Sequence, residues 1–108
     1  MNMAHKETSL ELGLQAEVLL AKAMVDTTCQ KWETAEVTLE KASSIIKEGR
    51  NFVTQNEAKR MQGDLYMIEG YHYLRYMKET RDEVPRPKYL GLAEVSVKGA
   101  LQTFTNLP

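Results

Sequence analysis

A glutamate and a histidine one helical turn apart are the first residues whose spacing suggests chemistry. Glu69 and His72 have the Glu-x-x-His spacing with which helical bundles build carboxylate metal sites. Such a site needs a second motif of the same kind and further glutamates from facing helices. The other histidine, His5, lies close to the N-terminus. We therefore predict a partly exposed or hydrogen-bonded histidine beside tyrosines, with no metal ion and no other cofactor.

Tyrosines gather around the same histidine. The group consists of Tyr66, Tyr71, Tyr73 and Tyr76, with Arg75 among them. A tyrosine combines an apolar ring with a polar hydroxyl, which suits a protein interface as well as a half-buried core position. We predict that these residues form a partner-binding surface. Core packing with the hydroxyls directed outward is the alternative.

The densest basic region follows the tyrosines. It contains Arg75, Lys78, Arg81, Arg86 and Lys88, and it is diluted by Glu79, Asp82 and Glu83. A small regulator that binds nucleic acid through residues 75–88 is therefore the alternative function. The whole chain argues against that alternative, because its 14 Lys and Arg are balanced by 15 Asp and Glu, a net charge of −1. Proteins that bind nucleic acid through bulk charge normally carry a clear basic excess.

Catalytic motifs are missing from the sequence. It has no glycine-rich phosphate loop, no Gly-x-Ser-x-Gly, no His-Glu-x-x-His and no Cys-x-x-Cys. The single cysteine, Cys29, excludes an intrachain disulfide framework and indicates a small apolar residue or a surface thiol. We predict that the protein is not an enzyme.

Length and composition predict one small domain. The chain has 108 residues, of which 43% are hydrophobic, and two separate cores would need roughly 150 residues or more. It shows no secretory signal and no apolar run near the ~20 residues that span a membrane. We predict a cytoplasmic protein with no membrane contact, a flexible tail over residues 1–7 and a helical domain over 8–108.

Apolar residues repeat every three or four positions in four segments, which predicts four helices. The first begins at a capping box, Thr8 to Glu11, and ends near residues 26–28. One face holds Leu10, Leu14, Val18, Ala21 and Val25 and another holds Leu12, Leu19 and Ala23, so we expect this helix to be covered on two sides. The second helix is one-sided, with Trp32, Ala35, Leu39, Ala42 and Ile46 buried, and it stops at Gly49.

The third predicted helix is the longest. It opens with a second capping box, Thr54 to Glu57, and runs to about Glu79. Apolar residues surround it almost completely, which predicts a central helix. Gly63 and Gly70 lie seven residues apart on one stripe, which indicates that another helix approaches closely there.

A loop with two prolines spans residues 80–88 and precedes the last helix, Pro87 to Phe104. Its predicted buried residues are Leu90, Ala93, Val97, Ala100, Leu101 and Phe104. We therefore predict an all-α fold of four helices in two antiparallel hairpins.

Matching residues recur in the two predicted hairpins. Ala21, Met24 and Thr28 match Gly63, Tyr66 and Gly70, while Ala35, Leu39 and Ala42 match Ala93, Val97 and Ala100. This pattern resembles a degenerate tetratricopeptide repeat, in which small residues let paired helices close up and large ones fill the gaps. Trp32 stands at the aromatic position of that family's inter-helix turn. An ordinary four-helix bundle is the alternative, because Ala35 and Ala93 are 58 residues apart and the family repeats every ~34.

An all-α domain of this size buries little surface by itself. Six Met and five Tyr favour an apolar surface that meets a partner or a second copy. We therefore predict a non-catalytic protein-interaction module, such as an adaptor, a small chaperone or an assembly subunit. Its partner is another protein or a second copy of the chain in a homo-oligomer.

Overall fold

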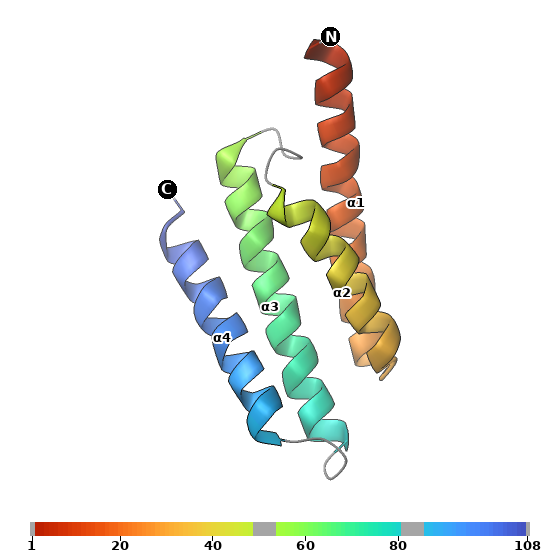
Figure 1. Ribbon diagram of the computed structural model, residues 1–108, viewed down its shortest axis with the longest axis vertical. Helices are drawn as coiled ribbons and strands as arrows, with labels where there is room; N and C mark the ends of the chain where they lie inside the picture. The colour runs from red at the N-terminus through yellow and green to blue at the C-terminus, as the bar shows by residue number, and fades with distance from the viewer. Residues whose placement is uncertain (1, 49–53, 81–85, 108) are drawn as a thin grey trace.

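The chain folds into four α-helices in two antiparallel hairpins (Figure 1). The computed structural model describes residues 2–48, 54–80 and 86–107. The helices are α1 (Asn2–Thr28), α2 (Trp32–Lys47), α3 (Gln55–Thr80) and α4 (Arg86–Thr105). The described segments contain no β-strand. The predicted all-α class and the two-hairpin order of the helices are therefore confirmed.

The first helix is longer than its sequence signal indicates. We expected the helix to start at Thr8, after a tail over residues 1–7, and that start is wrong because α1 begins at Asn2. The stretch before Thr8 contains no glycine or proline. Once a helix is nucleated, such residues extend it by one hydrogen bond each.

The turn between α1 and α2 closes the first hairpin with a Schellman motif. The backbone N–H of Lys31 donates to the carbonyl of Asp26 over 2.8 Å, and that of Gln30 donates to Thr27 over 3.0 Å. Gln30 has a φ of 62°, in the left-handed region that favours glycine. The three-residue connection therefore places α2 directly against α1.

The second and third helices match their sequence patterns. On α2 the predicted stripe is right for Ala35, Leu39, Ala42 and Ile46, which are buried, whereas Trp32 is only half-buried and the polar Thr38, outside the predicted stripe, is buried too. The backbone N–H of Glu57 donates to the Thr54 hydroxyl over 3.1 Å, which is the N-cap bond of the predicted capping box at the start of α3. The predicted central position of α3 is also confirmed, since it packs against α1, α2 and α4.

The two glycines of α3 mark the contact with α4. A Cβ on Gly63 would lie 2.7 Å from the Phe104 ring, and one on Gly70 would lie 3.2 Å from Val97 Cγ2. On α4, Gly99 packs against Tyr66 in the same way. A Cβ built on Gly99 would lie 3.0 Å from the nearest atom of the Tyr66 ring. The close approach of a helix predicted from Gly63 and Gly70 is therefore confirmed.

Of the two predicted buried faces of α1, the one with Leu14, Val18 and Val25 is wrong, and the side chain of Leu10 on that face lies outside the described residues. On the other face, Ala23 is buried and Leu12 and Leu19 are half-buried. Leu14, Val18 and Val25 are exposed, while α1 buries a row made mostly of small residues. That row contains Gly13, Ala16, Leu20, Ala23 and Thr27. Small side chains allow α2 and α3 to approach the α1 backbone closely, so they define the inner face even though the other row is more apolar.

The prediction for α4 is right for its alanines and wrong for its large residues. Ala93 and Ala100 are buried and Phe104 is half-buried, but Leu90, Val97 and Leu101 are exposed. The reason is that α4 packs on α3 alone among the described helices. A helix with one neighbour buries a single narrow row of side chains.

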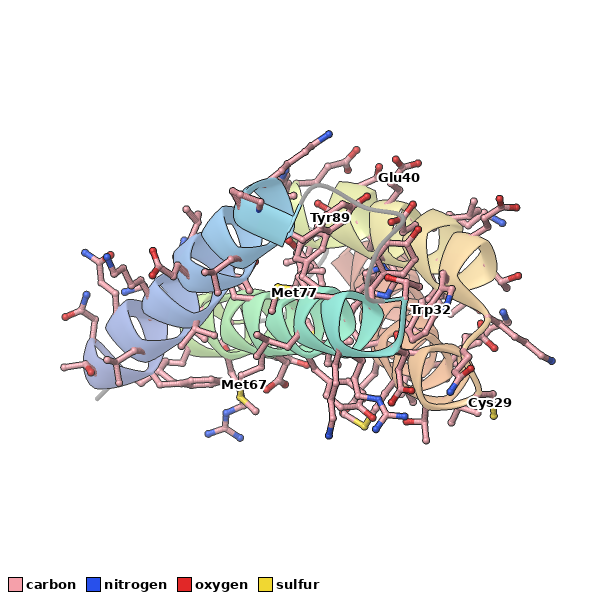
Figure 2. The ribbon with its side chains drawn as sticks, turned by 90° about the horizontal axis from the view of Figure 1, so that it is seen from below. Cys29, Trp32, Glu40, Met67, Met77 and Tyr89 are labelled. Atoms are coloured by element: carbon pink, nitrogen blue, oxygen red, sulfur yellow. The ribbon has the colours of Figure 1, made fainter. Side chains whose placement is uncertain are left out.

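The four helices form a slab of two layers. The molecule measures 54 × 28 × 16 Å, and Figure 2 shows α2 and α4 on one side with α1 and α3 on the other. Both α2 and α4 pack on α3, yet in the part of the chain described here they do not contact each other. The main apolar cluster lies between α1, α2 and α3.

Candidate functional site

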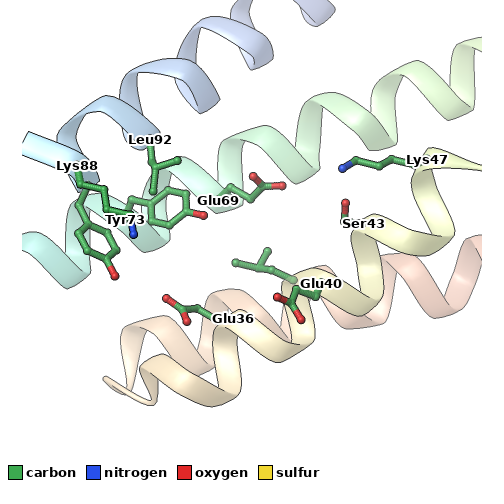
Figure 3. Close-up of a pocket in the computed structure, with 10 residues that line it drawn as sticks. Glu36, Glu40, Ser43, Lys47, Glu69, Tyr73, Lys88 and Leu92 are labelled. Carbon is green, nitrogen blue, oxygen red and sulfur yellow. The ribbon is translucent and has the colours of Figure 1, made fainter.

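An open groove lies between α2 and α4, and α3 forms its floor (Figure 3). It exists because both helices rest on α3 without closing over it. Its volume is about 320 Å³. The walls are Glu36, Leu39, Glu40, Ser43 and Lys47 of α2, Glu69 and Tyr73 of α3, and Lys88, Tyr89 and Leu92 of α4. We call this feature the α2–α4 groove.

An aromatic cluster lies at one end of the α2–α4 groove. Its members are Trp32, His72, Tyr73, Tyr76 and Tyr89. The ring of Tyr76 lies 5.1 Å from both Trp32 and Tyr89, measured between centroids, and it is edge-on to Trp32. Aromatic pairs at such distances contribute about 0.5–1.5 kcal/mol beyond their buried area. The cluster therefore ties α2 and α4 to α3 at this end.

His72 is the buried centre of the aromatic cluster. Its Nδ1 lies 3.1 Å from the Thr27 hydroxyl, and its Nε2 lies 3.3 Å from a carboxylate oxygen of Glu36. Burial lowers the pKa of His72, although the hydrogen bond to Glu36 opposes that shift. The ring is therefore neutral near pH 7, so Nε2 donates to Glu36 and Nδ1 accepts from Thr27. The contact with Glu36 is a hydrogen bond between a neutral ring and a carboxylate.

Of the two predicted alternatives for His72, the hydrogen-bonded histidine is confirmed and the partly exposed one is wrong, because the side chain is fully buried. Both ring nitrogens of His72 have partners within the protein, whereas Glu69, in the same Glu-x-x-His motif, lines the α2–α4 groove. Among the described residues, no cluster of His, Cys, Asp and Glu has the composition and geometry to hold a metal ion.

Three carboxylates line the α2–α4 groove together with Tyr73, namely those of Glu36, Glu40 and Glu69. Burial raises the pKa of Tyr73, and the negative charges of Glu69, Glu36 and Glu40 raise it further. The hydroxyl therefore stays protonated and can donate a hydrogen bond. Burial also raises the pKa of Glu69, an effect that the nearby Lys47 reduces. The glutamates of the groove consequently favour a positive charge beside them.

Lysines lie toward the ends of the α2–α4 groove. In Figure 3, Lys88 is beside Tyr73 at one end and Lys47 is beside Ser43 at the other. In the described part of the chain, neither lysine forms an ion pair within 4 Å of a groove glutamate. Glu36 accepts a hydrogen bond from His72, and none of the three carboxylates is neutralised by a groove lysine among the described residues, so the groove keeps negative charge that can attract a cation from outside.

The predicted tyrosine surface is divided among three neighbouring helices. Tyr66 packs over Gly99 of α4, and the Tyr71 hydroxyl hydrogen-bonds the Thr28 hydroxyl of α1 over 2.7 Å. Tyr73 and Tyr76 come together in the aromatic cluster. Arg75 lies apart from them, 3.8 Å from Glu79 on the next turn of α3. Tyr73 is the member of the predicted set that lines the α2–α4 groove.

Sequence reasoning missed four residues of this region. Glu36 and Glu40 are solvated charges in the α2 pattern, and nothing in that pattern shows that they face α3. The sequence places Trp32 at the aromatic position of a turn between helices, which does not predict a contact with His72. Tyr89 follows a proline-rich loop and does not belong to the apolar repeat of the last helix. Only the packing of three helices brings them together.

The basic region does not form a continuous cationic surface in the described residues. Arg75 is near Glu79, and Lys88 lines a groove that contains three glutamates. Residues 81–85 and the side chain of Arg86 lie outside the described part of the chain. Binding of nucleic acid through residues 75–88 stays a prediction.

Comparison with known proteins gives no relative. No protein-family model matches the chain, and no curated protein or solved structure matches it significantly. Within the described residues, none of the helices combines the length and the apolar character that crossing a bilayer requires. The function must therefore be inferred from the geometry of the groove.

Proposed function

We propose that the chain is a non-catalytic protein-interaction module that binds a basic, extended segment of a partner protein in the α2–α4 groove. The observation that supports this function is the open groove itself, which is lined by the carboxylates of Glu36, Glu40 and Glu69 together with Tyr73. A lysine or arginine of the partner would place its cation among Glu36, Glu40 and Glu69. The lysines lie toward the ends of the groove, so the cation of the partner would bind between them, beside the glutamates.

The groove also offers contacts to the rest of such a segment. The rings of Tyr73 and Tyr89 are half-buried, 5.9 Å apart between centroids, and they line the wall and floor. Tyrosine rings pack well on the aliphatic stem of lysine and attract its cation. The hydroxyls of Tyr73 and Ser43 can bond a peptide backbone. These features favour a peptide over a small uncharged ligand.

The arrangement of the hairpins supports a further part of the proposal, namely that they are tetratricopeptide-like repeats. α3 packs against both helices of the preceding hairpin, and α2 and α4 share one layer. Such a layered array leaves one concave face for ligands. The exposed thiol of Cys29, visible in Figure 2, is compatible with the reducing cytoplasm in which we propose that the protein acts.

The fluorescence of Trp32 provides a direct test. This residue is the single tryptophan of the chain and lies in the aromatic cluster. We expect a saturable change when the protein is titrated with a capped hexalysine peptide, and none with hexaglutamate. Glu40→Gln should weaken binding by about threefold to fivefold, because an exposed ion pair contributes up to about 1 kcal/mol. Tyr73→Ala should weaken it as well.

The matched control is Glu94→Gln. It changes the net charge of the chain by the same amount as Glu40→Gln, but Glu94 is an exposed residue of α4 that does not line the groove. Equal weakening by both variants would show that hexalysine binds through overall charge and would contradict the proposal. A salt-sensitive shift of generic duplex DNA with no peptide binding would favour the nucleic-acid alternative instead.

A further inference from the structure

The second helix of each hairpin buries the same small residues. Ala35, Thr38 and Ala42 pack inward on α2, and the residues 58 positions later, Ala93, Ser96 and Ala100, pack inward on α4. All six side chains are at most 5% exposed. α2 thus packs on α1 through the same row with which α4 packs on α3.

The next row of side chains along each helix is covered on α2 but exposed on α4. On α2, Leu39 is 5% exposed because α3 covers it as part of the main core. Its equivalent on α4, Val97, is 50% exposed. Trp32 contacts α3 through the rings of His72 and Tyr76, whereas its equivalent, Leu90, is 47% exposed. α4 therefore lacks, among the described helices, the neighbour that α3 provides to α2.

The uncovered row of α4 borders an apolar depression. Leu74 of α3 and Leu90, Ala93 and Val97 of α4 line a space of about 250 Å³, together with the charged residues Glu94 and Lys98 of α4. We call it the α3–α4 groove. The α4 residues that line the α2–α4 groove, Lys88, Tyr89 and Leu92, belong to a different face of the helix. The α3–α4 groove therefore corresponds in position to the surface of α1 and α2 on which α3 packs.

The opposite end of the slab carries an apolar row without a partner in the described chain. Leu14, Val18 and Val25 of α1 are 60%, 65% and 60% exposed. Their spacing is that of a buried helix face, which is why the sequence predicts burial. From Leu14 to Val25 the row is about 16 Å long at 1.5 Å per residue, and the row from Leu90 to Leu101 has the same length.

We infer that α1 of a second copy packs into the α3–α4 groove, in the way that α3 packs on α1 and α2 within one chain. The two surfaces differ, so the contact is head-to-tail, and each copy keeps one free end for another copy. The association therefore extends with concentration instead of stopping at a symmetric dimer. This inference concerns a surface separate from the α2–α4 groove, so it and the proposed peptide binding can fail independently.

A mixing experiment tests the head-to-tail contact. Val18→Lys blocks the α1 row, and Val97→Lys blocks the α3–α4 groove. Light scattering after size exclusion should show the wild type growing in mass with concentration, while each variant alone is a monomer. An equimolar mixture of the two variants should form a complex with the mass of two chains, because each supplies the face that the other lacks.

The control is Val95→Lys. Val95 is 67% exposed on α4 and lines neither groove, so this variant should associate like the wild type. Circular dichroism establishes that each variant is folded, and Leu101→Lys, on the same row at 68% exposure, replaces Val97→Lys if that variant unfolds. A wild type that stays monomeric at all concentrations overturns the inference. So does a mixture of the two blocked variants that stays monomeric.

Discussion

Replacing Gly63 with alanine tests how closely α4 packs against α3. Inside a helix, alanine is more favourable than glycine by about 1 kcal/mol. At Gly63 the new methyl group would lie 2.7–3.0 Å from three atoms of the Phe104 ring. Overpacking of this kind costs about 1–3 kcal/mol. We therefore expect Gly63→Ala to lower the free energy of unfolding by as much as about 2 kcal/mol.

Removing the ring should reverse the sign of that effect. In a Phe104→Ala background nothing opposes the methyl group, so Gly63→Ala should raise the free energy of unfolding by about 1 kcal/mol. The coupling between the two sites is then about 1–3 kcal/mol, which a double-mutant cycle measures directly. Urea titrations followed by circular dichroism provide the four free energies.

Gly91 of α4 offers the matched control. A Cβ at this position meets no heavy atom within 4 Å, so Gly91→Ala should stabilise the protein by about 1 kcal/mol in either background. If Gly63→Ala stabilises the wild type as much as the Phe104→Ala variant, the ring does not press on Gly63. The close approach of α3 and α4 would then be refuted.

Two further predictions concern the turn after α1 and the buried histidine. Gln30→Gly should raise the free energy of unfolding by about 1 kcal/mol, since Gln30 has a φ of 62°; Gln30→Ala, measured beside it by urea titration, should show no such gain. Burial holds the pKa of His72 below 6.5, so the unfolded chain binds the proton first as the pH falls. Stability should therefore decrease below pH 6.5, with a slope of at most about 1.4 kcal/mol per pH unit. Urea titrations across this range should find that His72→Gln removes the slope and His5→Gln retains it; an unchanged slope in His72→Gln would contradict the assignment.

The packing of α2 and α3 could be predicted from the sequence, because the apolar pattern of each helix allows only one arrangement. α2 has a single apolar stripe, so its buried face follows directly from the period of the helix. α3 is apolar nearly all round, and the glycines at positions 63 and 70 leave room for a neighbour, so its central place also follows. In both cases the local signal and the packing agree.

The inner face of α1 could not be predicted, because the helix offers two rows at helical spacing. Hydrophobicity favours Leu14 and Val18, but the fold buries Ala16 and Ala23, where small side chains permit close contact. Which row turns inward depends on the distance between helix axes, and that distance is set by residues of other helices. A row that is apolar and yet exposed is itself informative about a missing partner.

The candidate site was predicted in part. Tyr73 belongs to the tyrosine group recognised in the sequence, but Glu36 and Glu40 carry no signal that distinguishes them from other surface charges. Their role depends on α2 and α4 resting side by side on α3 without touching. No spacing along the chain encodes the width of that gap.

The attachment of α4 to a single neighbour gives the molecule an unequal resistance to local opening. Detaching α4 breaks one interface, whereas detaching α3 breaks three. Amide protons of α4 should consequently exchange with solvent through a smaller opening than those of α3, and proteases should reach its backbone first. Both grooves have α4 as a wall, so a peptide in one or a neighbouring chain on the other would slow this exchange. Measuring amide exchange in α4 would therefore detect binding in either of the two grooves.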